Sequence, residues 1–143
     1  MANLNNSNPA IFNSTNQQEA YGYIYSQNGS TTAFRSDGPN FINLNEGGTA
    51  LIPGPATFNG WTAVGIWHTH PFSTTNPTGI DLNTGTHFSP SDENLTNSTG
   101  LTMYVGVTDT TSSPIDTNPQ TRWYSYTGGT TDTLMGNVGN GGC

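Results

Sequence analysis

Residues 61–95 read WTAVGIWHTHPFSTTNPTGIDLNTGTHFSPSDENL, and they decide how the fold of the chain is interpreted. The first ten of these residues are predicted to form a strand, buried on both sides because both of its faces carry apolar residues. Side chains alternate between the two faces of a strand. One face therefore carries two apolar side chains followed by two imidazoles: Val64, Ile66, His68 and His70. Two histidines at this spacing make the far end of the strand a candidate metal site.

The segment Ser89-Pro90-Ser91-Asp92 is typical of a helix start. Serine stands at the N-cap, proline at the first helical position and an acid two residues later. We therefore expect a short helix over residues 90–97, stopped by Gly100. A zinc ion with one position open for water needs a third protein ligand beside two histidines, and Asp92 is the best candidate. The two roles are compatible, because a helix N-terminus holds Asp92 and Ser89 in a fixed orientation.

The combination of His-Thr-His-Pro at 68–71 with Ser-x-x-Asp at 89–92 resembles the signature of the JAMM (MPN-type) zinc metalloproteases. In that family the two histidines and the aspartate bind zinc, and the serine helps to hold the tetrahedral intermediate. The resemblance therefore implies that His68, His70 and Asp92 bind Zn²⁺ and that Ser89 is catalytic. The segment between the second histidine and the serine is longer here than in the common form of the family.

The family also uses a glutamate on an earlier strand as general base. Glu19 opens the sequence E-A-Y-G-Y-I-Y, which looks like the E-x-x-G-hydrophobic strand of the family. Glu46, in N-E-G-G, looks like a turn residue, so we choose Glu19 and keep Glu46 as the next candidate. The order of segments matches the family over roughly residues 17–108. In style the chain is closest to the JAB-like domains at the ends of bacterial Rhs-type and other polymorphic toxins.

His87, two residues before Ser89, could also be considered as a fourth ligand. A closed site with four protein ligands would leave no place for a catalytic water. We therefore expect His87 to lie outside the ligand set.

The chain is expected to fold as one α/β domain, since 143 residues suit a single modest core. Alternating segments outnumber the one convincing helix, which predicts a curved, mainly antiparallel sheet with few short helices and long Gly/Pro/Asn/Thr loops. The resemblance implies the cytidine-deaminase-like MPN fold. We expect a polar N-terminal arm over 1–13, the MPN/JAMM-like domain over 14–127 and a flexible glycine-rich tail over 128–143. Strands are expected over residues 19–26, 31–36, 41–44, 61–70, 101–107 and 121–126.

The composition argues against several partners. The net charge is −7 and the only firm cations are Arg35 and Arg122, which disfavours binding to nucleic acid or to anionic membranes. No apolar run approaches the ~20 residues that span a bilayer, and the N-terminus has no secretory signal. The lysine-free, Asn/Thr-rich composition nevertheless favours a secreted or extracellular protein. Cys143 is the single cysteine and could pair between two chains, so self-association stays open, although an incidental residue is favoured.

Two classes of function remain open. The first is a zinc-dependent metallopeptidase or isopeptidase that hydrolyses an amide bond of a protein or peptide with a metal-activated water, in a secreted effector or toxin domain. The second is a non-catalytic MPN-like binding module or a subunit of an extracellular, filament-type assembly. The presence of all five motif residues favours the enzyme.

Overall fold

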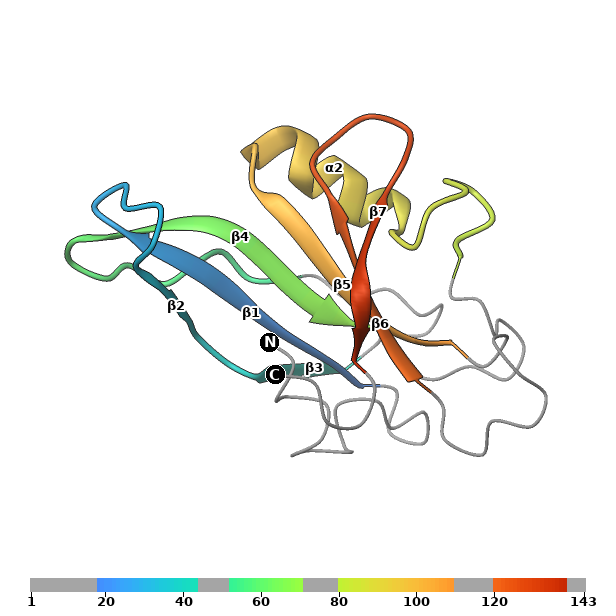
Figure 1. Ribbon diagram of the computed structural model, residues 1–143, viewed down its shortest axis with the longest axis horizontal. Coiled ribbons are helices and arrows are strands. Elements are labelled where there is room, and N and C mark those ends of the chain that lie inside the picture. The colour runs from blue at the N-terminus through green and yellow to red at the C-terminus, as the bar shows by residue number, and fades with distance from the viewer. Residues whose placement is uncertain (1–17, 44–51, 71–79, 110–119, 139–143) are drawn as a thin grey trace.

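A seven-stranded mixed sheet forms the framework of the protein (Figure 1). The computed structural model describes residues 18–43, 52–70, 80–109 and 120–138. The strands follow the order β2-β1-β4-β5-β6-β7 across the sheet, and β3 pairs with β1 beside this path. The elements are β1 (Gln18–Gln27), β2 (Phe34–Ser36), β3 (Asn40–Asn43), β4 (Trp61–Thr69), α2 (Pro90–Thr99), β5 (Thr102–Asp109), β6 (Gln120–Tyr126) and β7 (Thr133–Val138).

The histidine strand β4 lies in the middle of the sheet and is paired along both edges. It runs antiparallel to β1, with His68 opposite Tyr21, and parallel to β5, with His68 opposite Val105. The other neighbouring strands are antiparallel. A parallel pair needs a long crossover connection, and the connection from β4 to β5 contains α2. The predicted mixed α/β class with a mainly antiparallel sheet is confirmed.

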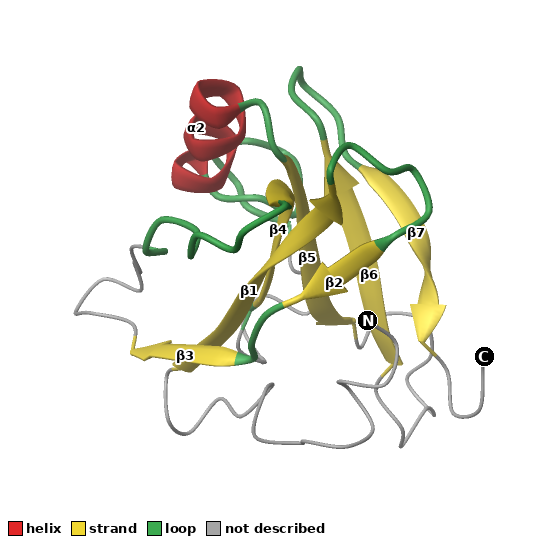
Figure 2. Ribbon diagram, turned by 90° about the vertical axis from the view of Figure 1, so that its left-hand side faces the viewer, coloured by secondary structure: helices red, strands yellow, loops and turns green. Residues whose placement is uncertain are grey.

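The main core lies between α2 and one face of the sheet (Figure 2). Leu95 of α2 and Phe88, just before the helix, pack against apolar side chains from four strands, β1, β4, β5 and β6, and from the segments that flank them. The buried members of this core are Tyr23, Tyr25, Ile66, Phe88, Met103, Val105, Val107, Tyr124 and Tyr126. A smaller cluster of Ala20, Trp67 and Trp123 covers part of the opposite face. The alternating side chains of β1 and β4 therefore serve two different apolar layers.

Gly22 of β1 is required by a close approach on the second face. A Cβ atom at this position would lie 2.3 Å from the carbonyl oxygen of Asp37 and 2.5 Å from Nε1 of Trp67. The same indole nitrogen donates a hydrogen bond to Oγ of Ser36 at 2.8 Å. A side chain at Gly22 would push the Trp67 ring and the chain near Asp37 away from β1.

The N-terminal half of the sheet differs in detail from the expectation. The second strand was expected over residues 31–36 but forms only over Phe34–Ser36. Ser30 explains the difference, because its Oγ accepts hydrogen bonds from the backbone N–H groups of Thr32 and Ala33 and holds them in the turn.

The tail prediction is wrong for residues 133–138, which form β7 against β6. Gly128 and Gly129 have φ values of 110° and 101°, so they reverse the chain and return it antiparallel to β6. Glycine content suggested flexibility there, whereas in the structure it makes a hairpin connection. The expected arm over 1–13 and the end of the tail over 139–143 lie outside the described residues.

The predicted helix is present and two residues longer than expected, ending at Thr99 before Gly100 in the left-handed conformation (φ 71°). Within the described ranges, no helix has the length and apolar character needed to cross a membrane.

Candidate metal centre

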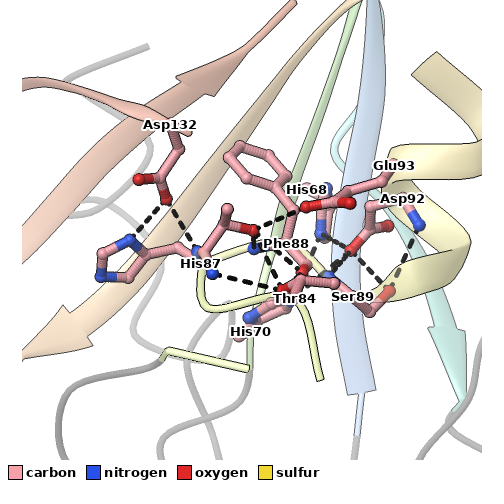
Figure 3. A network of polar contacts seen from close by, with 10 residues as sticks. His68, His70, Thr84, His87, Phe88, Ser89, Asp92, Glu93 and Asp132 are labelled. Atoms are coloured by element: carbon pink, nitrogen blue, oxygen red, sulfur yellow. Dashed lines mark hydrogen bonds and ion pairs between the residues drawn. The ribbon is translucent and has the colours of Figure 1, made fainter. Parts of the chain in front are cut away.

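Three side chains from two elements converge where β4 ends and α2 begins (Figure 3). His68 lies in β4, His70 directly follows it, and Asp92 lies in the first turn of α2. Nε2 of His68 is 3.2 Å from Nε2 of His70 and 3.5 Å from Oδ2 of Asp92. Nε2 of His70 is 3.9 Å from the same Oδ2 atom. The structure thus brings together the three residues that the sequence singled out as ligands, in a group that could hold a metal ion.

The spacing of these three atoms fits a small cation. Bonds of about 2.0–2.1 Å in tetrahedral geometry place two ligand atoms about 3.3–3.4 Å apart. The observed separations of 3.2, 3.5 and 3.9 Å lie around this value. The carboxylate oxygen carries lone pairs, and each Nε2 atom carries one in the tautomer with its proton on Nδ1, so a cation placed between the three atoms could be bound by all of them. The donor set of two imidazoles and one carboxylate is also that of catalytic zinc sites with an open position.

Burial differs among the three residues, which gives the centre an accessible side. His68 is 1% exposed and Asp92 is 9% exposed. The side chain of His70 is 23% exposed. His70 is therefore the most exposed of the three residues, and His68 is the most deeply buried.

Asp92 is held by the helix start itself. Its Oδ2 atom accepts hydrogen bonds from the backbone N–H of Ser89 at 2.9 Å and from the Ser89 hydroxyl at 2.8 Å. The backbone N–H of Asp92 donates in return to Oγ of Ser89 at 3.3 Å, which completes a capping box. The cap and the candidate ligand are therefore one residue, and the oxygen that closes the cap is the one that faces the histidines.

His68 is oriented by packing as much as by hydrogen bonding. Its Nδ1 atom is buried and has no hydrogen-bond partner among the residues that the structure describes. The ring of Phe88 lies beside it, with centroids 6.4 Å apart at an interplanar angle of 64°. Metal-ligating histidines commonly donate their second ring nitrogen to an acceptor. At His68 no such acceptor lies among the described residues, and the ring packs beside the fully buried Phe88.

Electrostatics couple the carboxylate to the imidazoles. Burial alone would raise the pKa of Asp92, but the neighbouring His68 and His70 lower it well below the usual range. Burial alone would lower the pKa of His68, but Asp92, and more weakly Glu19, raise it above the ordinary value. The carboxylate of Asp92 and the two imidazoles are therefore electrostatically coupled, and each favours the charged form of the other.

Glu19 lies next to the centre on β1. Tyr21 is opposite His68 at the end of the β1–β4 pairing, and Glu19 lies two residues before Tyr21, where His68 and His70 both influence its carboxyl. The backbone N–H of Ala20 donates to Oγ1 of Thr69 at 3.1 Å, which fixes the end of β1 against β4. Burial is the largest influence on the Glu19 carboxyl and raises its pKa, although the two histidines of the centre lower it. Glu19 is not a member of the three-residue group of candidate ligands.

The remaining candidates from the sequence have separate positions. His87 contacts Asp132 through Nδ1 at 2.6 Å and is not part of the ligand group, as expected. Glu46, the second candidate for the general base, lies outside the described residues.

Two residues that contact His68 or the loop before α2 were not identified from the sequence. Phe88 lies between His87 and Ser89 in a polar segment of the sequence. A single aromatic residue in such a segment is a signal of burial, and Phe88 is fully buried in the structure. Asp132 had no such signal, because it lies in a Gly/Thr-rich segment and its contact with His87 spans 45 residues.

Comparisons of the chain with protein-family models, with curated proteins and with solved structures find no match. The similarity to the JAMM signature therefore rests on the motif residues themselves. Their geometry shows a candidate metal centre formed by His68, His70 and Asp92.

Proposed function

We propose that the protein is a zinc-dependent metallopeptidase or isopeptidase of the JAMM (MPN) type, acting on an amide bond of a protein or peptide. The observation that carries the proposal is the convergence of two imidazoles and one carboxylate, with an open side at His70 and the Glu19 strand alongside. The secreted effector or toxin setting suggested by the resemblance belongs to the same proposal.

His68, His70 and Asp92 would hold the ion, and the ion would supply a bound water of pKa about 7 together with Lewis-acid polarisation of a carbonyl. Glu19 would accept the proton of the attacking water and return it to the leaving amine. Its buried carboxyl suits this role, because burial raises its pKa toward the range where a general base works at neutral pH. The opposite directions of the pKa shifts of Glu19 and Asp92 support different proposed roles for them: proton transfer for Glu19 and metal binding as a carboxylate for Asp92.

Ser89 would donate a hydrogen bond to the oxyanion that develops on the substrate. Its hydroxyl now donates to Oδ2 of Asp92, so the donation to substrate requires an exchange of partners. The exchange is small, because Asp92 keeps the hydrogen bond from the backbone N–H of Ser89. Loss of one oxyanion donor typically costs about 10²–10³ in rate.

The proposal is tested with the purified full chain. Metal content is measured by elemental analysis, and hydrolysis is measured on a panel of peptide and isopeptide substrates with and without added zinc. We expect about one zinc per chain and hydrolysis that is lost on chelation and restored by zinc. Two histidines and one carboxylate also suit non-haem iron, so stoichiometric iron without zinc would contradict the hydrolase.

Glu19→Gln separates catalysis from metal binding. The amide is similar in size to the carboxyl but cannot take up the proton of the water. We expect zinc content and melting temperature to remain near those of the wild type while the rate falls by about 10²–10⁴. Full activity in Glu19→Gln would assign the base elsewhere, with Glu46 as the next candidate. A zinc-loaded wild type that cleaves nothing in the panel would favour the non-catalytic binding or assembly module.

A further inference from the structure

A second histidine–aspartate pair, His87 and Asp132, connects the loop that leads into α2 with the segment just before β7 (Figure 3). The backbone N–H of His87 donates to Oδ2 of Asp132 at 2.7 Å, and its Nδ1 lies 2.6 Å from the same oxygen. A carboxylate only accepts hydrogen bonds, so Nδ1 carries the proton. The imidazole also stacks on Tyr124 of β6, with ring centroids 3.5 Å apart and planes 13° apart. His87 is thus held by three contacts with two residues, Asp132 and Tyr124.

The two neighbours of His87 in the chain, Thr86 and Phe88, contact the elements that form the candidate metal centre. On one side, Oγ1 of Thr86 donates to Oε1 of Glu93 in the first turn of α2 at 3.0 Å. On the other side, Phe88 lies against the ring of His68. These contacts connect the anchored loop to both elements that supply the candidate ligands.

Ser89 extends the connection to the third ligand. It follows Phe88 directly and holds Oδ2 of Asp92 through its backbone N–H and its hydroxyl. A shift of the loop at His87 would therefore move Phe88 away from His68 and carry the cap at Ser89 with it. His68 is sensitive to such a shift, because its Nδ1 has no hydrogen-bond partner among the described residues.

We propose that Asp132 is a positioning residue of the metal centre: by fixing His87, it sets the position of Phe88 and Ser89 and so the geometry of His68 and Asp92. The inference rests on the proposed function only in requiring that the centre binds a metal. Asp132 touches none of the three candidate ligands in the contacts that the structure describes. Its effect passes through the loop of residues 86–89.

Cobalt(II) is the probe, because its visible absorption reports the number and geometry of its ligands. The metal-free full chain is titrated with Co²⁺ as wild type, Asp132→Ala and Asp132→Asn. Removing a supporting partner of a metal site typically costs 10–100-fold in metal affinity. We expect Asp132→Ala to weaken Co²⁺ binding by about tenfold or more and to change the absorption spectrum. Asp132→Asn keeps an acceptor oxygen and should restore most of both.

Asp37→Ala is the matched control. Asp37 is also a partly buried carboxylate with two hydrogen bonds, from the N–H of Tyr23 at 2.6 Å and from the hydroxyl of Tyr25 at 2.9 Å. Its contacts lie on β1, away from the loop before α2. We expect this variant to lower the melting temperature while leaving the cobalt spectrum and affinity unchanged.

The outcomes separate the two proposals. An unchanged spectrum and affinity in folded Asp132→Ala would overturn the positioning role, and so would equal losses in Asp132→Ala and Asp37→Ala. A wild type that does not bind Co²⁺ would overturn the metal centre itself and the inference with it. If Asp132→Ala does not fold, Asp132→Ser is measured against the same criteria.

Discussion

Oδ2 of Asp92 lies 3.5 Å from Nε2 of His68, so the first turn of α2 contacts the end of the central strand β4 through one carboxylate oxygen. The same atom accepts both hydrogen bonds from Ser89 that close the helix cap. The side chain of Asp92 therefore closes the helix cap and is also a candidate metal ligand, and the two roles can be separated by substitution.

Asp92→Asn should keep the helix and lose the metal. The amide oxygen can still accept the hydrogen bond from the N–H of Ser89, so most of the capping energy of about 1 kcal/mol is retained. An amide carries no charge to balance the cation, and loss of a ligand should cost more than the 10–100-fold typical of supporting residues, hence over ~100-fold in zinc affinity. Isothermal titration with zinc measures the affinity, and circular dichroism follows the helix.

Ser89→Ala is the reciprocal variant for that comparison. It removes the capping hydroxyl and should lower the free energy of unfolding by about 1 kcal/mol, while the carboxylate of Asp92 remains available to the ion. Zinc affinity that falls as far in Ser89→Ala as in Asp92→Asn would contradict the assignment of Asp92 as a ligand.

The metal-free protein should gain most stability from the His68–Asp92 pair in mildly acidic solution. The pKa of Asp92 is lowered, so its contribution is present above the ordinary value of 3.8 and is lost as the pH falls toward the folded-state pKa. The pKa of His68 is raised, so its contribution is present below the ordinary value of 6.5 and is lost as the pH rises through the folded-state pKa. Melting temperatures of the chelator-treated protein should therefore be highest relative to Asp92→Asn between about pH 4 and 6.5.

The stability that zinc adds should depend on pH in the opposite sense: it should grow as the pH rises. The ion binds the unprotonated imidazole, so it competes with the proton that the raised pKa of His68 favours. The zinc-induced rise in stability should increase from pH 6 to pH 8, reaching about 4 kcal/mol when free zinc is 1,000 times the dissociation constant. Paired melts with and without zinc across this range measure it. A zinc effect that is largest at pH 5 would contradict histidine ligation.

Gly22→Ala should destabilise the protein strongly. The added Cβ would lie 2.3 Å from the Asp37 carbonyl oxygen and 2.5 Å from the Trp67 indole, and neither neighbour is the end of a flexible chain. Overpacking of this kind typically costs about 1–3 kcal/mol. Gly54→Ala is the control, because nothing lies within 4 Å of its Cβ position, and its effect should stay within about 0.5 kcal/mol. Chemical denaturation of both variants gives the difference, and equal stabilities would disprove the close packing around Gly22.

The local parts of this structure could be predicted from the sequence. The alternation along β4 placed His68 and His70 on one face, and the Ser-Pro-Ser-Asp segment marked the start of α2. These patterns depend on the geometry of one strand or one helix turn, which few neighbouring residues determine. The candidate ligands were found because their spacing within each element is itself local.

The long-range parts required the structure. Nothing in the local pattern states that Glu19 of β1 lies opposite the end of β4, because strand pairing depends on which apolar faces pack together in the whole domain. β7 was missed because Gly128 and Gly129 favour flexibility as much as a turn until the pairing with β6 is known. The contact of His87 with Asp132 has the same origin in the hairpin that brings Asp132 back.

The parallel pairing of β4 with β5 also determines when the metal centre can form during folding. Strands that are far apart in the sequence lose entropy when the long loop between them closes, before their contacts stabilise the pairing. Such pairings therefore form late. Asp92 lies on the crossover between these strands, so we expect its carboxylate to reach His68 only when β5 has paired with β4. The unfolded chain offers an ion only scattered side chains, which bind it weakly. Tight binding of an ion at His68, His70 and Asp92 would therefore mark the finished fold, and an incompletely folded chain would bind the ion only weakly.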